Sequence, residues 1–190
     1  MRASRSVALN DTDPFRPDAG RPVRVRARSM PADAHFDPHR HPWAQLAYCA
    51  TGMVQVSTAA SDHAHGETTY IVPPSRAVCI APGALHSVHV MEAAELRTLY
   101  IDASATPADW ATCRALVVSP LLREMVPALD DTEIGSAREA LLTALVLDEL
   151  RAAPVQPLGV PLPSWQTGDK RLRTLCEAVL RTPGRRATLA

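Results

Sequence analysis

The stretch His39-Arg40-His41-Pro42-Trp43-Ala44-Gln45 is the most informative part of this chain, and Gly52 closes the motif. A second motif, Pro82-Gly83-Ala84-Leu85-His86, follows about forty residues after the first. Successive side chains of an extended strand alternate between its two faces, so His39, His41 and Gln45 are expected to point into one interior. His86, on a separate strand behind a Pro-Gly turn, can complete the set. The spacing therefore predicts a metal site inside a small β-barrel.

The four predicted ligands are chemically unusual because none carries a negative charge. Three imidazoles suit a divalent transition metal such as Zn, Ni, Co, Fe or Mn. The amide oxygen of Gln45 is a weaker ligand than a carboxylate and leaves the charge of the cation exposed. An open coordination position would then attract an anion, such as a carboxylate effector. The alternative is a barrel mouth whose histidines hydrogen-bond a ligand or water without a metal.

Aromatic residues flank the histidine motif. Trp43 and Tyr48 are candidates for the wall of an effector pocket, although they suit an ordinary core equally well. The remaining histidines fit core or surface positions, including the His63-x-His65 pair, which falls in a predicted hairpin loop. His89 is expected on the face opposite His86.

Short β-rich runs fill the chain from Trp43 to Asp102, and turn signals such as Thr51-Gly52 and Pro73-Pro74 separate them. This pattern without intervening helices predicts an antiparallel sandwich or barrel. An earlier alternating run, Val23 to Arg28, predicts another strand whose arginine face is solvated. The later runs cover residues 45–49, 53–58, 68–72, 77–81, 85–90 and 96–101.

Helical patterns follow the β-rich part. We expect helices from Pro107 to Val117 and from Leu121 to Leu129, the latter capped by Ser119. A third begins with a capping box, Ser136 to Glu139, and ends near Ala153. These helices offer more apolar surface than a small barrel needs, which indicates a dimer formed through them.

The last part of the chain is organised differently. Four prolines in residues 154–168 predict a stiff linker. Asp169 to Leu180 is an amphipathic helix, and Thr188-Leu189-Ala190 starts another. A single amphipathic helix cannot bury its apolar side alone, so we expect a second domain lying mostly beyond Ala190.

Composition bounds the function only loosely. The 190 residues carry 20 Lys and Arg against 20 Asp and Glu, so bulk charge does not indicate nucleic acid. The four cysteines form no C-x-x-C motif and are expected to be buried or partly buried free thiols. No signal peptide and no run of eighteen apolar residues is found. We therefore expect a cytoplasmic protein without a membrane segment.

The two histidine motifs resemble the cupin signatures. The first matches H-x-H-x3-E-x6-G at each spacing, with Gln45 in the Glu position. The second resembles P-x-G-x2-H-x3-N through Gly83 and His86, but Ala81 and Val90 replace the Pro and the Asn. The resemblance implies a cupin-type antiparallel β-barrel, or jelly roll, followed by α-helices.

Nearly the whole chain is similar to the N-terminal half of AraC/XylS-type transcription regulators. The similar segments include Tyr70 to Ala77, Leu96 to Ile101 and Val118 to Glu124. The resemblance implies an effector-sensing barrel, a helical dimerisation segment, and operator DNA bound only through helix-turn-helix units beyond Ala190. It divides the chain into an arm (1–21), barrel (22–103), dimerisation segment (104–153), linker (154–168) and the start of the DNA-binding domain (169–190).

This resemblance predicts a regulator and not an enzyme. The alternative is a small metal-dependent cupin enzyme, a dioxygenase or an isomerase. The missing Glu and the lack of an evident general base count against that alternative.

Overall fold

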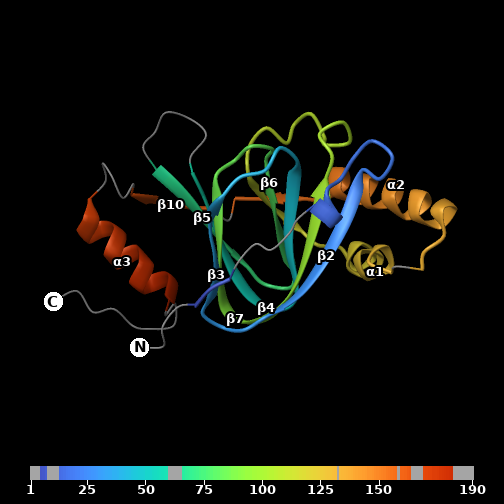
Figure 1. Cartoon of the computed structure of the whole chain (residues 1–190). Coiled ribbons are helices and arrows are strands. Elements are labelled where there is room, and N and C mark those ends of the chain that lie inside the picture. Colours follow the sequence, from blue (N-terminus) through green and yellow to red (C-terminus); the bar gives the residue numbers. More distant parts are fainter. Residues whose placement is uncertain are drawn as a thin grey trace.

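A computed structural model describes residues 5–7, 13–59, 66–131, 133–157, 159–163 and 169–181. Antiparallel strands form a barrel, α1 and α2 cover one side of it, and α3 lies at the opposite end (Figure 1). The strands are β1 (Arg5–Ser6), β2 (Val23–Met30), β3 (Ala34–His39), β4 (Ala44–Ala59), β5 (Gly66–Val72), β6 (Arg76–Ile80), β7 (His86–Ile101), β8 (Arg114–Val117), β9 (Val155–Gln156) and β10 (Val160–Pro163). The helices are a 3-10 turn (η1, Asp13–Phe15), α1 (Pro120–Leu129), α2 (Ser136–Ala152) and α3 (Lys170–Arg181).

Two long strands organise the barrel. β4 pairs with β7 from Ala44↔Ile101 to Thr58↔His86. β7 also pairs with β2 and β3, whereas β4 also pairs with β5 and β6. Every pairing between described strands is antiparallel except β1 with β3. The predicted antiparallel barrel with helices after it is confirmed.

Four of the predicted strands are in fact two. The runs 45–49 and 53–58 belong to β4, and the runs 85–90 and 96–101 belong to β7. The register of the β4–β7 ladder shifts between Cys49 and Val54, where Gly52 has a φ of +76°. The prediction that a strand ends at Thr51-Gly52 is therefore wrong, because Gly52 forms a bulge within one continuous strand.

Side chains of β4 divide between two cores. Leu46 and Tyr48 pack with α1 and α2 on the outside of the barrel. Ala47 and Cys49 belong to the cluster inside it. Even-numbered residues of β7 such as Val88 and Leu96 are also inside. The alternation of strand side chains thus separates a helical layer from a barrel interior.

The predicted strand at residues 23–28 is confirmed as part of β2, but the prediction that its arginine face is solvated is wrong. Val23 and Val25 pack against the helical layer. The arginines occupy the other face, which is the barrel interior, and Arg26 is only 7% exposed.

The predicted helix from 107 to 117 is wrong. Trp110 is buried and its N–H donates to the carbonyl of Pro107 in a turn. β8 follows and pairs with β6, with Ala115 and Leu116 buried. Burial of this apolar pair in the sheet outweighs the local helical pattern.

The next two helices are confirmed, but only one has its predicted cap. Ser119 accepts a hydrogen bond from the N–H of Leu122 at 3.0 Å and begins α1. α2 is capped by Gly135 without a side-chain hydrogen bond. Glu139 binds Arg21 instead of the helix terminus, so the predicted capping box does not form.

The described part of the predicted linker, residues 154–157 and 159–163, lies on the barrel. β9 pairs with β8, and β10 pairs with β5. Beyond it, Arg173 of α3 is buried and forms an ion pair with Glu67 of β5 at 2.7 Å. The predicted helix start at 188–190, and His63 and His65, lie outside the described residues.

Two composition-based expectations bear on the described residues. Cys49, Cys79, Cys113 and Cys176 are free thiols and buried or partly buried, as predicted. None of the described helices combines the length and apolar character needed to cross a membrane.

Gly52→Ala tests the bulge of β4. An added Cβ would lie 2.2 Å from the carbonyl oxygen of Ala93. We expect the substitution to lower the free energy of unfolding by about 2–5 kcal/mol, from the positive φ and the overlap together. Gly83 has a φ of +75° with nothing within 4 Å, so Gly83→Ala should cost only about 1–2 kcal/mol. If urea denaturation showed the same loss of unfolding free energy for both variants, the close approach of Gly52 to the Ala93 carbonyl would be contradicted.

Candidate functional site

The three predicted histidines meet at one end of the barrel although they do not share a strand. His39 ends β3, His41 lies in the connection to β4, and His86 begins β7. His39 and His86 are cross-strand partners. The prediction that one strand presents His39, His41 and Gln45 is therefore wrong in its geometry, but the structure does bring these side chains together.

A β-bulge turns His39 inward. Phe36 pairs with Val88 and His39 with His86, so β3 contains one more residue than β7 between the two pairs. The extra length includes Pro38, which has no N–H for the ladder. Without the bulge, Phe36 and His39 would face opposite sides of the sheet.

The imidazoles lie close enough to share one cation. The ring centroids of His39 and His86 are 4.2 Å apart, and those of His41 and His86 are 5.0 Å apart. One ligand nitrogen from each of the three residues lies within 4.8 Å of the others. Ligands bound at the usual metal–nitrogen distance are about 3.0–3.4 Å apart, so small side-chain rotations suffice to close the set on a metal.

Backbone carbonyls fix which ring nitrogen carries the proton. The Nδ1 atoms of His39, His41 and His86 lie 2.8, 2.8 and 3.0 Å from the carbonyl oxygens of Asp37, Trp43 and Ala84. Nδ1–H is the donor in each pair. The lone pair is left on Nε2, the arrangement that metal-binding histidines use.

Burial favours the neutral form of two of these rings, His41 and His86. It lowers the pKa of His86 to about 3, reinforced by the two neighbouring histidines and opposed by the hydrogen bond to Ala84. It also lowers the pKa of His41, against the opposing effect of hydrogen bonds to Gln45 and Trp43. Neutral imidazole is the form that binds a metal.

His86 provides the test of fit for a metal. Its Nε2 is buried and has no hydrogen-bond partner among the described residues. A buried polar atom without a partner is costly. A cation held by the three Nε2 atoms would satisfy this one, so the residues present fit a transition metal.

Gln45 lies where a fourth ligand is expected. Its Oε1 is 2.7 Å from Nε2 of His41. With the proton of His41 on Nδ1, this contact joins two acceptors unless the amide is turned by 180°. Two ligands on adjacent positions of one metal lie about 3 Å apart, so a cation would also resolve this contact.

The aromatic residues take separate positions. Trp43 stacks on His41 with centroids 5.2 Å apart and supports the ring from outside the pocket. Tyr48 belongs to the helical layer, because it lies before the bulge of β4, where even-numbered residues face α1 and α2. The prediction that Tyr48 lines the effector pocket is wrong.

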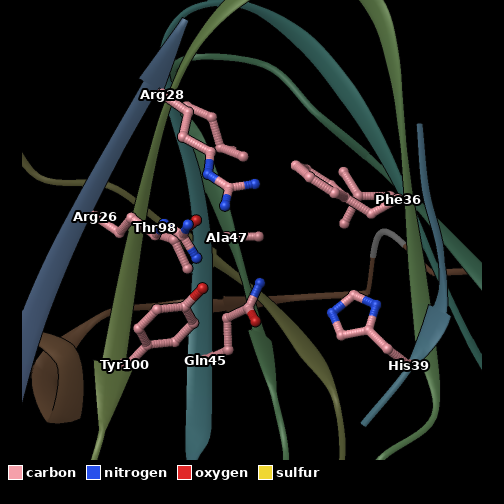
Figure 2. Close-up of a pocket in the computed structure, with 10 residues that line it drawn as sticks. Arg26, Arg28, Phe36, His39, Gln45, Ala47, Thr98 and Tyr100 are labelled. Atoms are coloured by element: carbon pink, nitrogen blue, oxygen red, sulfur yellow. The ribbon is translucent and has the colours of Figure 1, made fainter. Parts of the chain in front are cut away.

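A pocket inside the barrel adjoins the histidines (Figure 2). Its free cavity measures about 20 Å³, which is room for one ordered water molecule. Long side chains from β2 project across it. The lining residues are Arg26, Arg28, Phe36, His39, Gln45, Ala47, Val88, Leu96, Thr98 and Tyr100.

Sequence reasoning missed the arginines of this pocket. The signal was present, since Val23 and Val25 alternate with arginines and either set could face the interior. Two apolar layers flank β2, one from the helices and one from the barrel, and the valines face the helices. Only the position of α1 and α2 decides which face of β2 points into the barrel.

A barrel with inward polar groups at one end of an internal pocket, packed on a helical pair, defines a ligand-binding domain. Residues 21–159 match the family model of the AraC-like ligand binding domain. The chain belongs to this family.

Two known proteins are similar to this chain, one in sequence and one in fold. It is 30% identical over 167 residues to the HTH-type transcriptional regulator NimR of Escherichia coli K12, and the match covers 78% of this chain and 59% of NimR. The crystal structure of apo ToxT K231A from Vibrio cholerae shares the fold, with a TM-score of 0.52 and 8% identity over 91% of this chain and 69% of that one. The chain thus spans little more than half the length of the curated relative.

Single alanine substitutions test the metal ligands. We expect His39→Ala, His41→Ala or His86→Ala each to lower metal affinity by at least about 100-fold, since loss of a ligand costs more than loss of its outer hydrogen bond. Elemental analysis and a chelator competition titration measure this. His35 and His89 pair across β3 and β7 outside this cluster, and their alanine variants should retain the metal. Unchanged metal content in all three ligand variants would disprove the site.

Proposed function

We propose that this chain is the effector-sensing and dimerisation part of a bacterial AraC-type transcription regulator. The observation that carries the proposal is the inward cluster of His39, His41, His86 and Gln45 beside an internal pocket, in a chain of the AraC-like ligand-binding family. A divalent transition metal bound to the cluster would leave a position for a small-molecule effector.

We further propose that the barrel senses its ligand without converting it. None of the ten residues that line the pocket is a carboxylate able to act as a general base. A metal held by neutral ligands keeps its full positive charge and favours binding of an anion. Turnover of a small diketone or a phosphosugar by the metal-loaded chain would support the alternative, a cupin dioxygenase or isomerase.

Operator DNA is bound, in this proposal, by helix-turn-helix units beyond Ala190, and the protein works in the cytoplasm. Support comes from α3, which leaves Leu172, Leu175 and Val179 each at least 50% exposed. An apolar helix face of this kind is typical of a domain whose other helices cover it. The proposed division of the chain is an arm (1–21), a barrel (22–103), a dimerisation segment (104–153), a linker (154–168) and the start of a DNA-binding domain (169–190).

A link between sensor and α3 is present in the described residues. Glu67 of β5 pairs with the buried Arg173, and β5 also carries β10. An effector can act on DNA binding only if it prefers one of two arrangements of barrel and helices. This ion pair is one contact that could differ between them.

The homodimer is proposed to form through α1 and α2. α2 is apolar on two sides: Val146, Leu147 and Leu150 are buried, whereas Leu141 and Leu145 are 73% and 41% exposed. Leu121 of α1 is 46% exposed. A second copy of the same helices would cover this surplus apolar surface.

Extending the chain tests the regulatory function. A version that continues past Ala190 to the length of its relatives should bind promoter DNA in a mobility-shift assay, and the 190-residue chain should not. Replacing His39, His41 and His86 together by alanine should leave DNA binding intact and abolish the response of a reporter gene to its inducing conditions. DNA binding by residues 1–190 alone would overturn the proposal that this part senses the effector and a later domain binds DNA.

Charge placed on the exposed side of α2 tests the dimer. Leu141→Asp with Leu145→Asp should convert a dimer to a monomer in analytical ultracentrifugation, since a buried unpaired carboxylate costs several kcal/mol. Leu172→Asp with Leu175→Asp introduces the same two charges at leucines of α3 that are 50% and 56% exposed and should leave the dimer intact. A dimer unaffected by the α2 variant would refute association through these helices.

A further inference from the structure

Two arginines inside the barrel have no role in the functions described so far. Arg26 and Arg28 lie two residues apart on β2 and extend toward the middle of the pocket (Figure 2). Arg26 is only 7% exposed, and its Nη1 has no hydrogen-bond partner among the described residues. A charged group buried in this way costs free energy unless something opposes its charge.

The surroundings of Arg26 favour an external partner. No acidic residue is among those that line the pocket. The Cζ atom of Arg26 lies 4.9 Å from the centroid of the Phe15 ring, and that of Arg28 lies 5.2 Å from the Phe36 ring. A guanidinium stacked on a ring keeps its N–H edge directed sideways, in the geometry that binds a carboxylate with two hydrogen bonds.

The two positive charges act on each other. Burial lowers the pKa of Arg28, and the neighbouring charge of Arg26 lowers it further, against a smaller opposing effect of Tyr100. An anion placed between the two groups would oppose both effects. The rest of the wall is apolar where Phe36, Val88 and Leu96 contribute to it, which suits the hydrocarbon part of an organic acid.

We propose that the ligand of this barrel is a small organic carboxylate, held through its carboxyl group by Arg26 and Arg28. Its apolar body would lie against Phe36, Val88 and Leu96. His39 and Gln45 line the same pocket, so the far end of the ligand reaches the metal cluster. The arginine side chains span a cavity that holds only about one water molecule, so binding must move them. The inference names the effector class of the proposed sensor and rests on that function.

The test compares acids with their neutral amides on the metal-free 190-residue chain. Hexanoate and benzoate at 100 times Kd should raise the melting temperature by roughly 5–10 °C, whereas hexanamide and benzamide should have no effect. Inorganic phosphate is the third probe and should also have no effect. A shift with phosphate and none with either carboxylate would overturn the proposal, as would equal shifts with acids and amides.

Arg26→Met tests the role of the buried arginine, because methionine has a similar length and no charge. It should weaken carboxylate binding by at least about 30-fold and, in the absence of ligand, raise the melting temperature, because an unpartnered buried charge is removed. Arg24→Met is the control, since Arg24 lies on the same strand, donates to the carbonyl of Pro14 and does not line the pocket. If Arg26→Met proves unstable, the comparison of acids with amides on the unsubstituted chain still decides.

The metal-loaded chain separates this proposal from the sensor function. A carboxylate effect that requires the metal and survives Arg26→Met would assign the anion to the cation and overturn the role of the arginines. Retained metal binding and regulated DNA binding without any carboxylate effect would refute this inference and leave the proposed function standing. Loss of regulation in the extended chain would refute the function itself.

Discussion

The pairing of β4 with β7 is the constraint on which the rest of the molecule depends. Each of these strands contains 16 residues, far longer than an average strand, and each pairs with further strands beyond their shared ladder. Because side chains alternate along both strands, the register on each side of the bulge assigns the residues there to the helical layer or to the barrel interior. A slip of β4 by one residue would move Gln45 out of the pocket and bring Leu46 into it.

The same alternation explains what could be predicted from the sequence. The strand pattern, the antiparallel class and the helices α1 and α2 follow from local periodicity and turn residues. The meeting of His39, His41 and His86 also followed from the motifs. Periodicity says which residues share a face, but it does not say what covers that face. The side of β2 that carries its arginines, the position of Tyr48 and the strand β8 all depend on where the helices pack.

The proposed site combines polar groups that the fold leaves unsatisfied. Buried side-chain atoms without a hydrogen-bond partner in the described part of the chain belong to Arg26, Trp43, Tyr48 and His86. Arg26 lines the pocket together with His39 and Gln45, and the ring of His86 lies beside that of His39, with centroids 4.2 Å apart. A core of this size could have been filled by aliphatic residues at lower cost. Stability given up at such positions is characteristic of a site that ligands complete.

The strand β10 has a consequence for how copies of this protein can meet. Pro161 and Pro163 alternate with Val160 and Leu162 in its pairing with β5. Because prolines lack an N–H, the donors of β10 come from the other two residues and point toward β5. The outer edge of the strand therefore offers no donor at these prolines to an approaching chain. A sheet edge closed in this way resists the strand-to-strand aggregation that an open edge invites.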